Sequence, residues 1–125
     1  MGWTLDKNRP IYLQLVEELQ SRIVSGVYPP GTKIDSVRDL AAEAAVNPNT
    51  MQRALAELEQ SGLLRSERTS GRFVTEDRAL IAEVRRALAR EKIEAFVRDM
   101  SVLGFGQQEL LNLIREGMEA ARSHE

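Results

Sequence analysis

A helix-start signal that directly follows a short helical segment restricts the fold of this chain more than any other feature. Asn47 is a residue type that caps helices, and Pro48 suits the first helical position, where its missing N–H removes no hydrogen bond. The apolar residues behind this signal recur at helical spacing and predict one buried face: Met51, Ala54, Leu55 and Leu58. The preceding segment, residues 36–45, predicts a shorter helix that begins at a Ser36 cap. Two helices joined by so tight a turn predict a helix-turn-helix.

The flanking segments extend this motif on both sides. Pro10 begins an amphipathic helix that ends at Gly26. After the third helix, residues 63–67 and 72–75 predict two short strands with a turn between them. The order helix, helix, helix, hairpin is typical of a winged helix-turn-helix, in which the hairpin is the wing.

Beyond Asp77 the chain predicts two further helices. This segment has no proline, and no glycine lies between Gly71 and Gly104. Its apolar stripes are Ile81, Val84 and Leu88, then Ile93, Phe96, Val97, Met100 and Leu103, and in the last helix Leu110, Leu111, Ile114 and Met118. The stripe rotates around the long helix, which favours contact with more than one partner element. The sequence thus predicts a mainly α fold, with a winged helix-turn-helix domain at residues 1–76 and a two-helix domain at residues 77–125.

The composition excludes several kinds of functional site. The chain has no cysteine, which excludes a disulfide scaffold, a cysteine-built zinc site and a thiol nucleophile. Its single histidine, His124, leaves little basis for a histidine triad, and no glycine-rich phosphate loop occurs. We therefore predict that the protein is not an enzyme and uses no metal or cofactor. The sequence shows no signal peptide and no membrane-length apolar run, and we predict a cytoplasmic protein.

The charge balance gives no sign of a nucleic-acid partner. The chain has 17 basic residues against 19 acidic ones, and its formal net charge is −2. A DNA-binding role therefore requires that the basic residues cluster in space, since they are not in excess.

The start of the third predicted helix carries the most informative polar residues. They are Asn49, Thr50, Gln52 and Arg53, all within its first two turns and away from the buried stripe. Amide and guanidinium groups can form paired hydrogen bonds with base edges, and a helix N-terminus can bind a phosphate oxygen. The alternative is a polar surface helix, in which Asn47 is only a cap.

Arginines on the neighbouring segments fit the same interface. Arg38 lies on the second predicted helix, where it can bind the phosphate backbone. Arg65, Arg68 and Arg72 bracket the hairpin turn and suit a wing that lies over a sugar-phosphate edge or a minor groove. Each has a plainer alternative, Arg38 as a surface residue beside Glu43 and the wing arginines as charges that prevent strand pairing.

Several ordered motifs over residues 9–76 resemble the GntR-type winged-helix regulators. They are Pro10-Ile11-Tyr12-Leu13-Gln14-Leu15, Gly26-Val27-Tyr28-Pro29-Pro30-Gly31, Ser36-Val37-Arg38-Asp39-Leu40-Ala41, Val46-Asn47-Pro48-Asn49-Thr50 and Gly71-Arg72-Phe73-Val74. The remaining segment is too short for the larger effector domains of that family. It resembles the two-helix tail of the YtrA subfamily through Phe96-Val97-Arg98-Asp99-Met100 and Leu103-Gly104-Phe105.

The resemblance implies a sequence-specific transcriptional regulator, a repressor, that acts as a homodimer on a two-fold symmetric operator in double-stranded DNA. The residues that it assigns to DNA binding are Ser36, Arg38, Asn47, Asn49, Thr50, Gln52, Arg53, Arg68, Thr69, Ser70, Gly71 and Arg72. Together with the apolar stripes, it assigns dimerisation to Ile81, Val84, Leu88, Phe96, Val97, Met100, Leu110 and Ile114. A winged-helix protein–protein adaptor without specific DNA binding is the alternative function. The sequence identifies no small-molecule effector, although one is possible at the dimer interface or between the two domains.

Two residues depart from the family pattern. Asp35 stands where the family usually has proline, just before Ser36, and an acid there either repels phosphate or caps the helix dipole. Thr69 stands where the wing usually has a first glycine. The turn of the wing and its contact with the minor groove can therefore differ from the family pattern.

Overall fold

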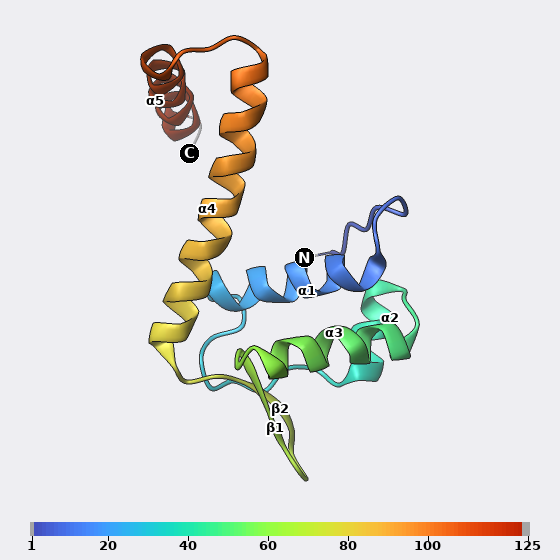
Figure 1. Ribbon diagram of the computed structural model, residues 1–125. Coiled ribbons are helices and arrows are strands. Elements are labelled where there is room, and N and C mark those ends of the chain that lie inside the picture. The colour runs from blue at the N-terminus through green and yellow to red at the C-terminus, as the bar shows by residue number, and fades with distance from the viewer. Residues whose placement is uncertain (1, 124–125) are drawn as a thin grey trace. The chain divides into compact units, whose positions relative to one another are not determined.

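The computed structural model of the protein describes residues 2–123, so His124 lies outside the described residues. In chain order its elements are α1 (Ile11–Val24), α2 (Val37–Ala44), α3 (Pro48–Gln60), β1 (Leu64–Glu67), β2 (Gly71–Val74), α4 (Arg78–Val102) and α5 (Gln107–Ser123) (Figure 1). This order confirms the predicted mainly helical fold, in which a hairpin follows the third helix and two further helices follow the hairpin.

The internal contacts divide the chain into two compact units, and the boundary lies inside α4, after Arg86. The sequence pattern predicts an earlier domain boundary, after Glu76. The two positions differ because the start of α4 packs with the first unit. Ile81 is only 9% exposed and belongs to the core of that unit, and Val84 packs against the same core.

The core of the first unit is built from the apolar faces of its first three helices and the base of the hairpin. Its large, fully buried side chains are Leu15, Leu19, Ile23, Leu40, Met51, Leu55, Leu58, Leu63 and Val74. The predicted buried stripe of the third helix is confirmed at all of its positions, Met51, Ala54, Leu55 and Leu58. Because α3 buries this face, its opposite face is exposed to solvent.

Side-chain caps fix the N-terminal ends of α2 and α3. Ser36 accepts a hydrogen bond from the backbone N–H of Asp39 at 3.2 Å, at the start of α2. Asn47 accepts one from the backbone N–H of Asn49 at 2.8 Å, at the start of α3. Ala45 ends α2 in the left-handed conformation, with φ of 58°. These caps set where the exposed face of α3 begins.

The wing is an antiparallel hairpin with a third segment along one edge. Leu64 pairs with Val74, and Ser66 pairs with Arg72. On the other side of β2, Lys33 forms an isolated bridge with Phe73. This edge has no signal in the sequence, because a single bridging residue between a turn and a helix cap shows no strand alternation.

A buried arginine joins α1 to α2. The side chain of Arg22 is 5% exposed, and it forms salt bridges to Glu18 at 3.2 Å and to Glu43 at 3.6 Å. Its guanidinium group also donates to the Tyr28 hydroxyl at 2.8 Å and lies 4.3 Å from the centre of the Trp3 ring. Burial alone lowers the pKa of Arg22, but the hydrogen bonds and charges of Tyr28 and Glu18 raise it above its ordinary value. The group therefore stays charged and holds α2, which carries Arg38, against α1.

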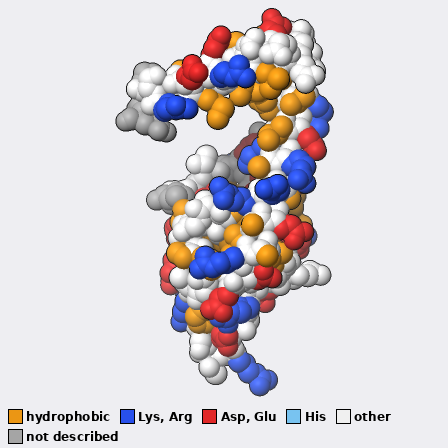
Figure 2. All heavy atoms as spheres, turned by 90° about the vertical axis from the view of Figure 1, so that its left-hand side faces the viewer, with side chains coloured by type: hydrophobic (Ala, Val, Ile, Leu, Met, Phe, Trp, Pro, Cys, Tyr) orange, Lys and Arg blue, Asp and Glu red, His pale blue; other side chains and the backbone are white. Residues whose placement is uncertain are grey.

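The second unit exposes most of its apolar side chains. None of residues 87–123 is buried, although α4 and α5 carry many large apolar residues. A groove of about 470 Å³ in this unit is lined by Phe96, Met100, Leu110, Leu113, Ile114, Gly117, Met118 and Ala121. Hydrophobic side chains gather in this part of the space-filling view (Figure 2). Within the described range, no helix is long and apolar enough to cross a membrane.

Candidate nucleic-acid interface

The solvent-exposed face of α3 presents polar side chains at its N-terminal end. Asn49, Gln52 and Arg53 are exposed, and Thr50 is half-buried. In the sequence they lie between the buried residues of the same helix. Because α3 packs its buried face against the core, these four side chains lie toward the opposite, outer side. The structure therefore brings together the four residues that the sequence singled out on this helix.

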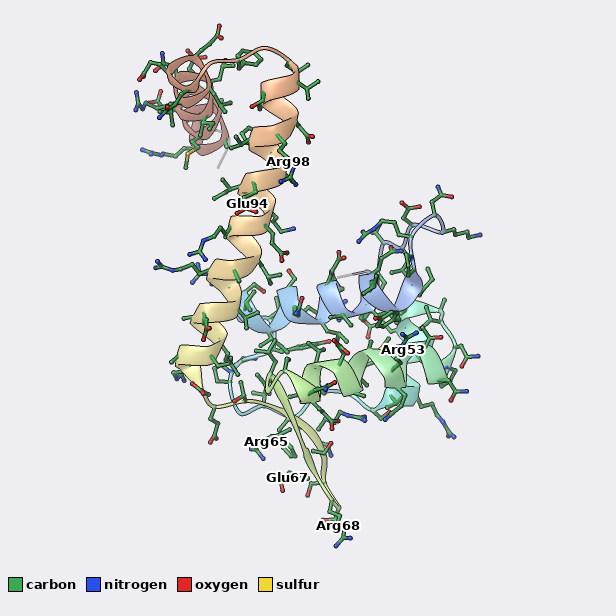
Figure 3. The ribbon with its side chains drawn as sticks, in the orientation of Figure 1. Arg53, Arg65, Glu67, Arg68, Glu94 and Arg98 are labelled. Carbon is green, nitrogen blue, oxygen red and sulfur yellow. The ribbon has the colours of Figure 1, made fainter. Side chains whose placement is uncertain are left out.

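Arg53 is held in place by an aromatic ring of α1. Its guanidinium carbon lies 3.7 Å from the centre of the Tyr12 ring, which is cation–π contact. Figure 3 shows the position of Arg53 on α3. Because the contact uses the face of the planar guanidinium group, the N–H groups along its edge can still donate hydrogen bonds. This pairing has no signal in the sequence, because it depends on how α1 crosses α3.

A basic hollow lies between the start of α2 and the wing. Its volume is about 400 Å³, and its lining includes Lys33, Ser36 and Arg38 together with Ser70 and Gly71. Within residues 2–123, no salt bridge engages Lys33 or Arg38. Two cations without an acidic partner, beside the free N–H groups of a helix start, form a site suited to a phosphate.

Asp35 lies at the same hollow. It is exposed, it lines the hollow, and it directly precedes the Ser36 cap of α2. Its carboxylate reduces the positive potential that Lys33 and Arg38 create. This departure from the family pattern therefore falls at the edge of the candidate interface.

The three arginines of the wing have different surroundings. Arg68 is exposed at the turn of the hairpin, where Figure 3 shows it directed away from the helices. Arg65 forms a salt bridge with Glu67, and its guanidinium carbon lies 5.1 Å from the centre of the Phe73 ring. Among the described residues, Arg68 is the wing arginine for which no salt bridge is seen.

Arg72 lies on β2 beside the turn of the hairpin, and an acid of α3 engages its side chain. Its side chain is 19% exposed and forms a salt bridge with Glu59 in the last turn of α3. Arg72 therefore contacts α3, and it also lines the basic hollow. Thr69 and Ser70, at the turn of the wing, are exposed, and Gly71 adopts φ of 111° against the Lys33 side chain. A Cβ at this glycine would lie 3.0 Å from Cε of Lys33, so a side chain there would force Lys33 to move.

Glu59 is a residue of this region that the sequence analysis did not single out. Its carboxylate accepts hydrogen bonds from Arg72 and from the Ser66 hydroxyl. Burial alone raises the pKa of Glu59, but the hydrogen bonds from Arg72 and Ser66 and the charge of Arg72 together lower it below its ordinary value. The residue is therefore ionised at neutral pH. Helical periodicity gave no signal for it, since an acid on an exposed helix face is common.

Comparisons with known proteins agree with this geometry. The family model described as "Bacterial regulatory proteins, gntR family" matches residues 11–74. The HTH-type transcriptional regulator YhcF of Bacillus subtilis (strain 168) is 38% identical over 86% of this chain and 89% of YhcF. The HTH-type transcriptional repressor YtrA of the same organism is 30% identical over 86% of this chain and 83% of YtrA.

Solved structures show the same fold. A GntR family transcriptional regulator from Listeria monocytogenes superposes with a TM-score of 0.84 at 37% identity, over 90% of this chain and 98% of that one. The DNA-binding domain of AraR, solved in complex with operator ORX1, superposes with a TM-score of 0.52 at 32% identity, over 60% of this chain and 92% of that one.

The matched segment, residues 11–74, spans α1 to β2 and so contains the exposed end of α3, the basic hollow and the wing. The matches to YhcF and YtrA extend beyond it, over most of the chain. The chain therefore belongs to the gntR family of bacterial regulatory proteins, a family of DNA-binding transcriptional regulators and not of enzymes.

Proposed function

We propose that the protein is a dimeric transcriptional repressor that binds a two-fold symmetric operator. In this proposal α3 enters the major groove, and the wing lies on the flanking backbone or in the minor groove. Two observations of the first unit carry it: the exposed polar end of α3, and a hollow between α2 and the wing whose Lys33 and Arg38 have no salt-bridge partner within residues 2–123. Such a protein would act in the cytoplasm, where bacterial DNA is found.

The residues of α3 divide into those that read bases and those that hold the helix. Asn49 and Gln52 are three positions apart on the exposed face, and their carboxamides can pair with adenine N6 and N7. Arg53 can form two hydrogen bonds with guanine O6 and N7 while Tyr12 keeps its guanidinium plane fixed. The side chain of Asn47 is used as the helix cap, so we assign it to positioning α3 and to backbone contact.

The contacts with phosphate come from the segments around α3. Arg38 and Lys33 would bind one phosphate group at the hollow, and Arg68 would bind another at the wing. Such contacts set the register of the protein on the duplex without reading its sequence. They also explain how a chain of net charge −2 can bind DNA. Acids neutralise Arg65 and Arg72, whereas Arg38, Lys33 and Arg68 would provide the positive charge that contacts phosphate.

Dimerisation would use the apolar surface of the second unit. Six of the predicted dimer residues lie in this unit, and none is buried: Leu88, Phe96, Val97, Met100, Leu110 and Ile114. Two helices cannot bury such a surface between themselves, whereas a second copy supplies an identical surface related by a two-fold axis. Ile81 and Val84 pack with the core of the first unit, so we leave them out of the proposed dimer surface.

An electrophoretic shift assay with the DNA upstream of the protein's own gene tests the proposal. We expect a shifted complex at low salt that survives an excess of mixed-sequence competitor duplex. The double variant Asn49→Ala, Gln52→Ala should lose this preference, and Arg115→Ala on α5 should keep it. The absence of any shift at low salt would contradict DNA binding and favour an adaptor role.

A further inference from the structure

The inward face of the wing changes from apolar to polar along the hairpin. Leu64 and Val74 form a cross-strand pair and are buried in the core. Side chains alternate along strands, so the next pair on the same face is Ser66 with Arg72. The core therefore ends at the first pair, and apolar packing no longer holds the wing beyond it.

Glu59 occupies the position next to this polar pair. Its carboxylate oxygen accepts a hydrogen bond from Ser66 at 2.8 Å and forms a salt bridge with Arg72, so one oxygen engages both strands. The side chains are partly shielded, with Arg72 19% and Glu59 30% exposed. This carboxylate thus connects β1 and β2 to the last turn of α3, the helix whose other end carries the exposed polar residues.

We propose that Glu59 is a positioning residue that fixes the orientation of the wing relative to α3, and thereby presents Arg68 to the DNA backbone. The proposal rests on the proposed DNA-binding function. In this role Glu59 touches no DNA. Arg72 belongs to the link that joins Glu59 to the wing, and it is not a phosphate contact.

The link from Glu59 to Ser66 and Arg72 compensates for the low stability of the wing as an isolated hairpin. Its strands have four residues each, and a two-stranded hairpin of this size is marginally stable by itself. The Lys33 bridge supports only the outer edge of β2. A wing that is already oriented loses less conformational freedom when it meets DNA, so each of its phosphate contacts adds more to the affinity. The link also leaves Arg68 as the wing cation without a salt bridge among the described residues.

A double-mutant cycle between Glu59 and Arg68 separates positioning from a general effect on folding. The variants are Glu59→Gln, which keeps the size of the side chain, Arg68→Ala and their combination. The probe is a duplex of the upstream fragment, and the readout is the dissociation constant from fluorescence anisotropy. We expect Arg68→Ala to weaken binding roughly threefold to fivefold in the unchanged background and less than about twofold beside Glu59→Gln.

Matched variants identify the source of the effect. Asn49→Ala should weaken binding by the same factor in the unchanged chain and in the Glu59→Gln variant, because α3 itself stays positioned. Arg72→Ala should reduce the effect of Arg68→Ala in the same way, since it breaks the same link from the other side. Thermal denaturation of each variant confirms that the first unit is folded under the binding conditions.

The outcomes distinguish this proposal from the proposed function. If Arg68→Ala weakens binding equally in both backgrounds, Glu59 does not position the wing, although the protein still binds DNA. If Glu59→Gln strengthens binding, Glu59 instead competes with phosphate for Arg72, and the positioning role is wrong. If the unchanged chain binds no DNA, the proposed function fails and the role of Glu59 fails with it.

Discussion

Arg53 packs its guanidinium group on Tyr12 while its helix position faces solvent, and in the proposed function it also reads a base. We expect Arg53→Ala to reduce the preference for operator over mixed-sequence DNA by about 1–3 kcal/mol, the value of one bidentate base contact. Competition binding measures this preference. Tyr12→Leu should cause a smaller loss, since it frees the guanidinium group without removing it, and Arg115→Ala on α5 should cause none. An unchanged preference in Arg53→Ala would mean that this residue reads no base.

The lowered pKa of Glu59 predicts how the first unit responds to acid. A carboxyl group whose pKa is lower in the folded state stabilises that state above its ordinary pKa, and this contribution is lost as the pH falls through the lowered value. We therefore expect the difference in free energy of unfolding between the unchanged chain and Glu59→Gln to be constant near neutral pH. It should shrink below the ordinary glutamate pKa of about 4.3. Urea denaturation at a series of pH values measures it, and a difference that does not change with pH would contradict the link to Arg72.

At the scale of elements, the turn between α2 and α3 contains a residue in an unfavourable conformation. Ala45 has φ of 58°, a region that glycine adopts without steric cost. We expect Ala45→Gly to raise the free energy of unfolding by about 0.5–1 kcal/mol. Ala42→Gly, an exposed position inside α2, should lower it by about the same amount. Thermal denaturation of the two variants measures both effects, and equal destabilisation by the two glycines would contradict the assigned cap.

The sequence predicts those elements whose signals are local. The helix starts at Ser36 and Asn47 follow from capping chemistry, and the hairpin follows from two short runs on either side of a turn. The Lys33 edge could not be predicted, since it consists of one bridge to a strand far along the chain. The position of Arg72 could not be predicted either, because its partner Glu59 is 13 residues away and is brought near only when the hairpin folds back on α3.

At the scale of the whole molecule, the apolar groove of the second unit should govern the oligomeric state. Phe96 lines this groove, and its side chain is 40% exposed. We expect Phe96→Glu to raise the dissociation constant of the dimer by about a hundredfold or more, because a carboxylate would lose its hydration in an apolar interface. Analytical ultracentrifugation measures this change. Val27→Glu, an exposed apolar residue of the first unit, is the matched control and should leave the dimer intact. A dimer of unchanged strength in Phe96→Glu would place the interface elsewhere.

The net charge of the whole chain proved a poor guide to its partner. The total of −2 adds all acids and bases together, whereas Lys33, Arg38 and Arg68 have no salt bridge among the described residues and Arg65 and Arg72 are paired with acids. Sequence composition cannot separate these groups, since pairing depends on the fold. Salt dependence of binding reports the cations that contact phosphate, with a log–log slope of about 0.9 for each contact, and is therefore a better measure of the interface than the net charge.

The central claim is that the protein is a two-fold dimer that reads the major groove with α3. The most direct test is selection of binding sequences from a pool of random double-stranded DNA with the purified full chain. We expect the enriched sequences to share an inverted repeat whose half-site centres lie about 10–10.5 base pairs apart, or a multiple of that spacing. The Asn49→Ala, Gln52→Ala variant should enrich no such repeat. Enrichment of a single unsymmetrical site, or of no sequence at all, would contradict the claim.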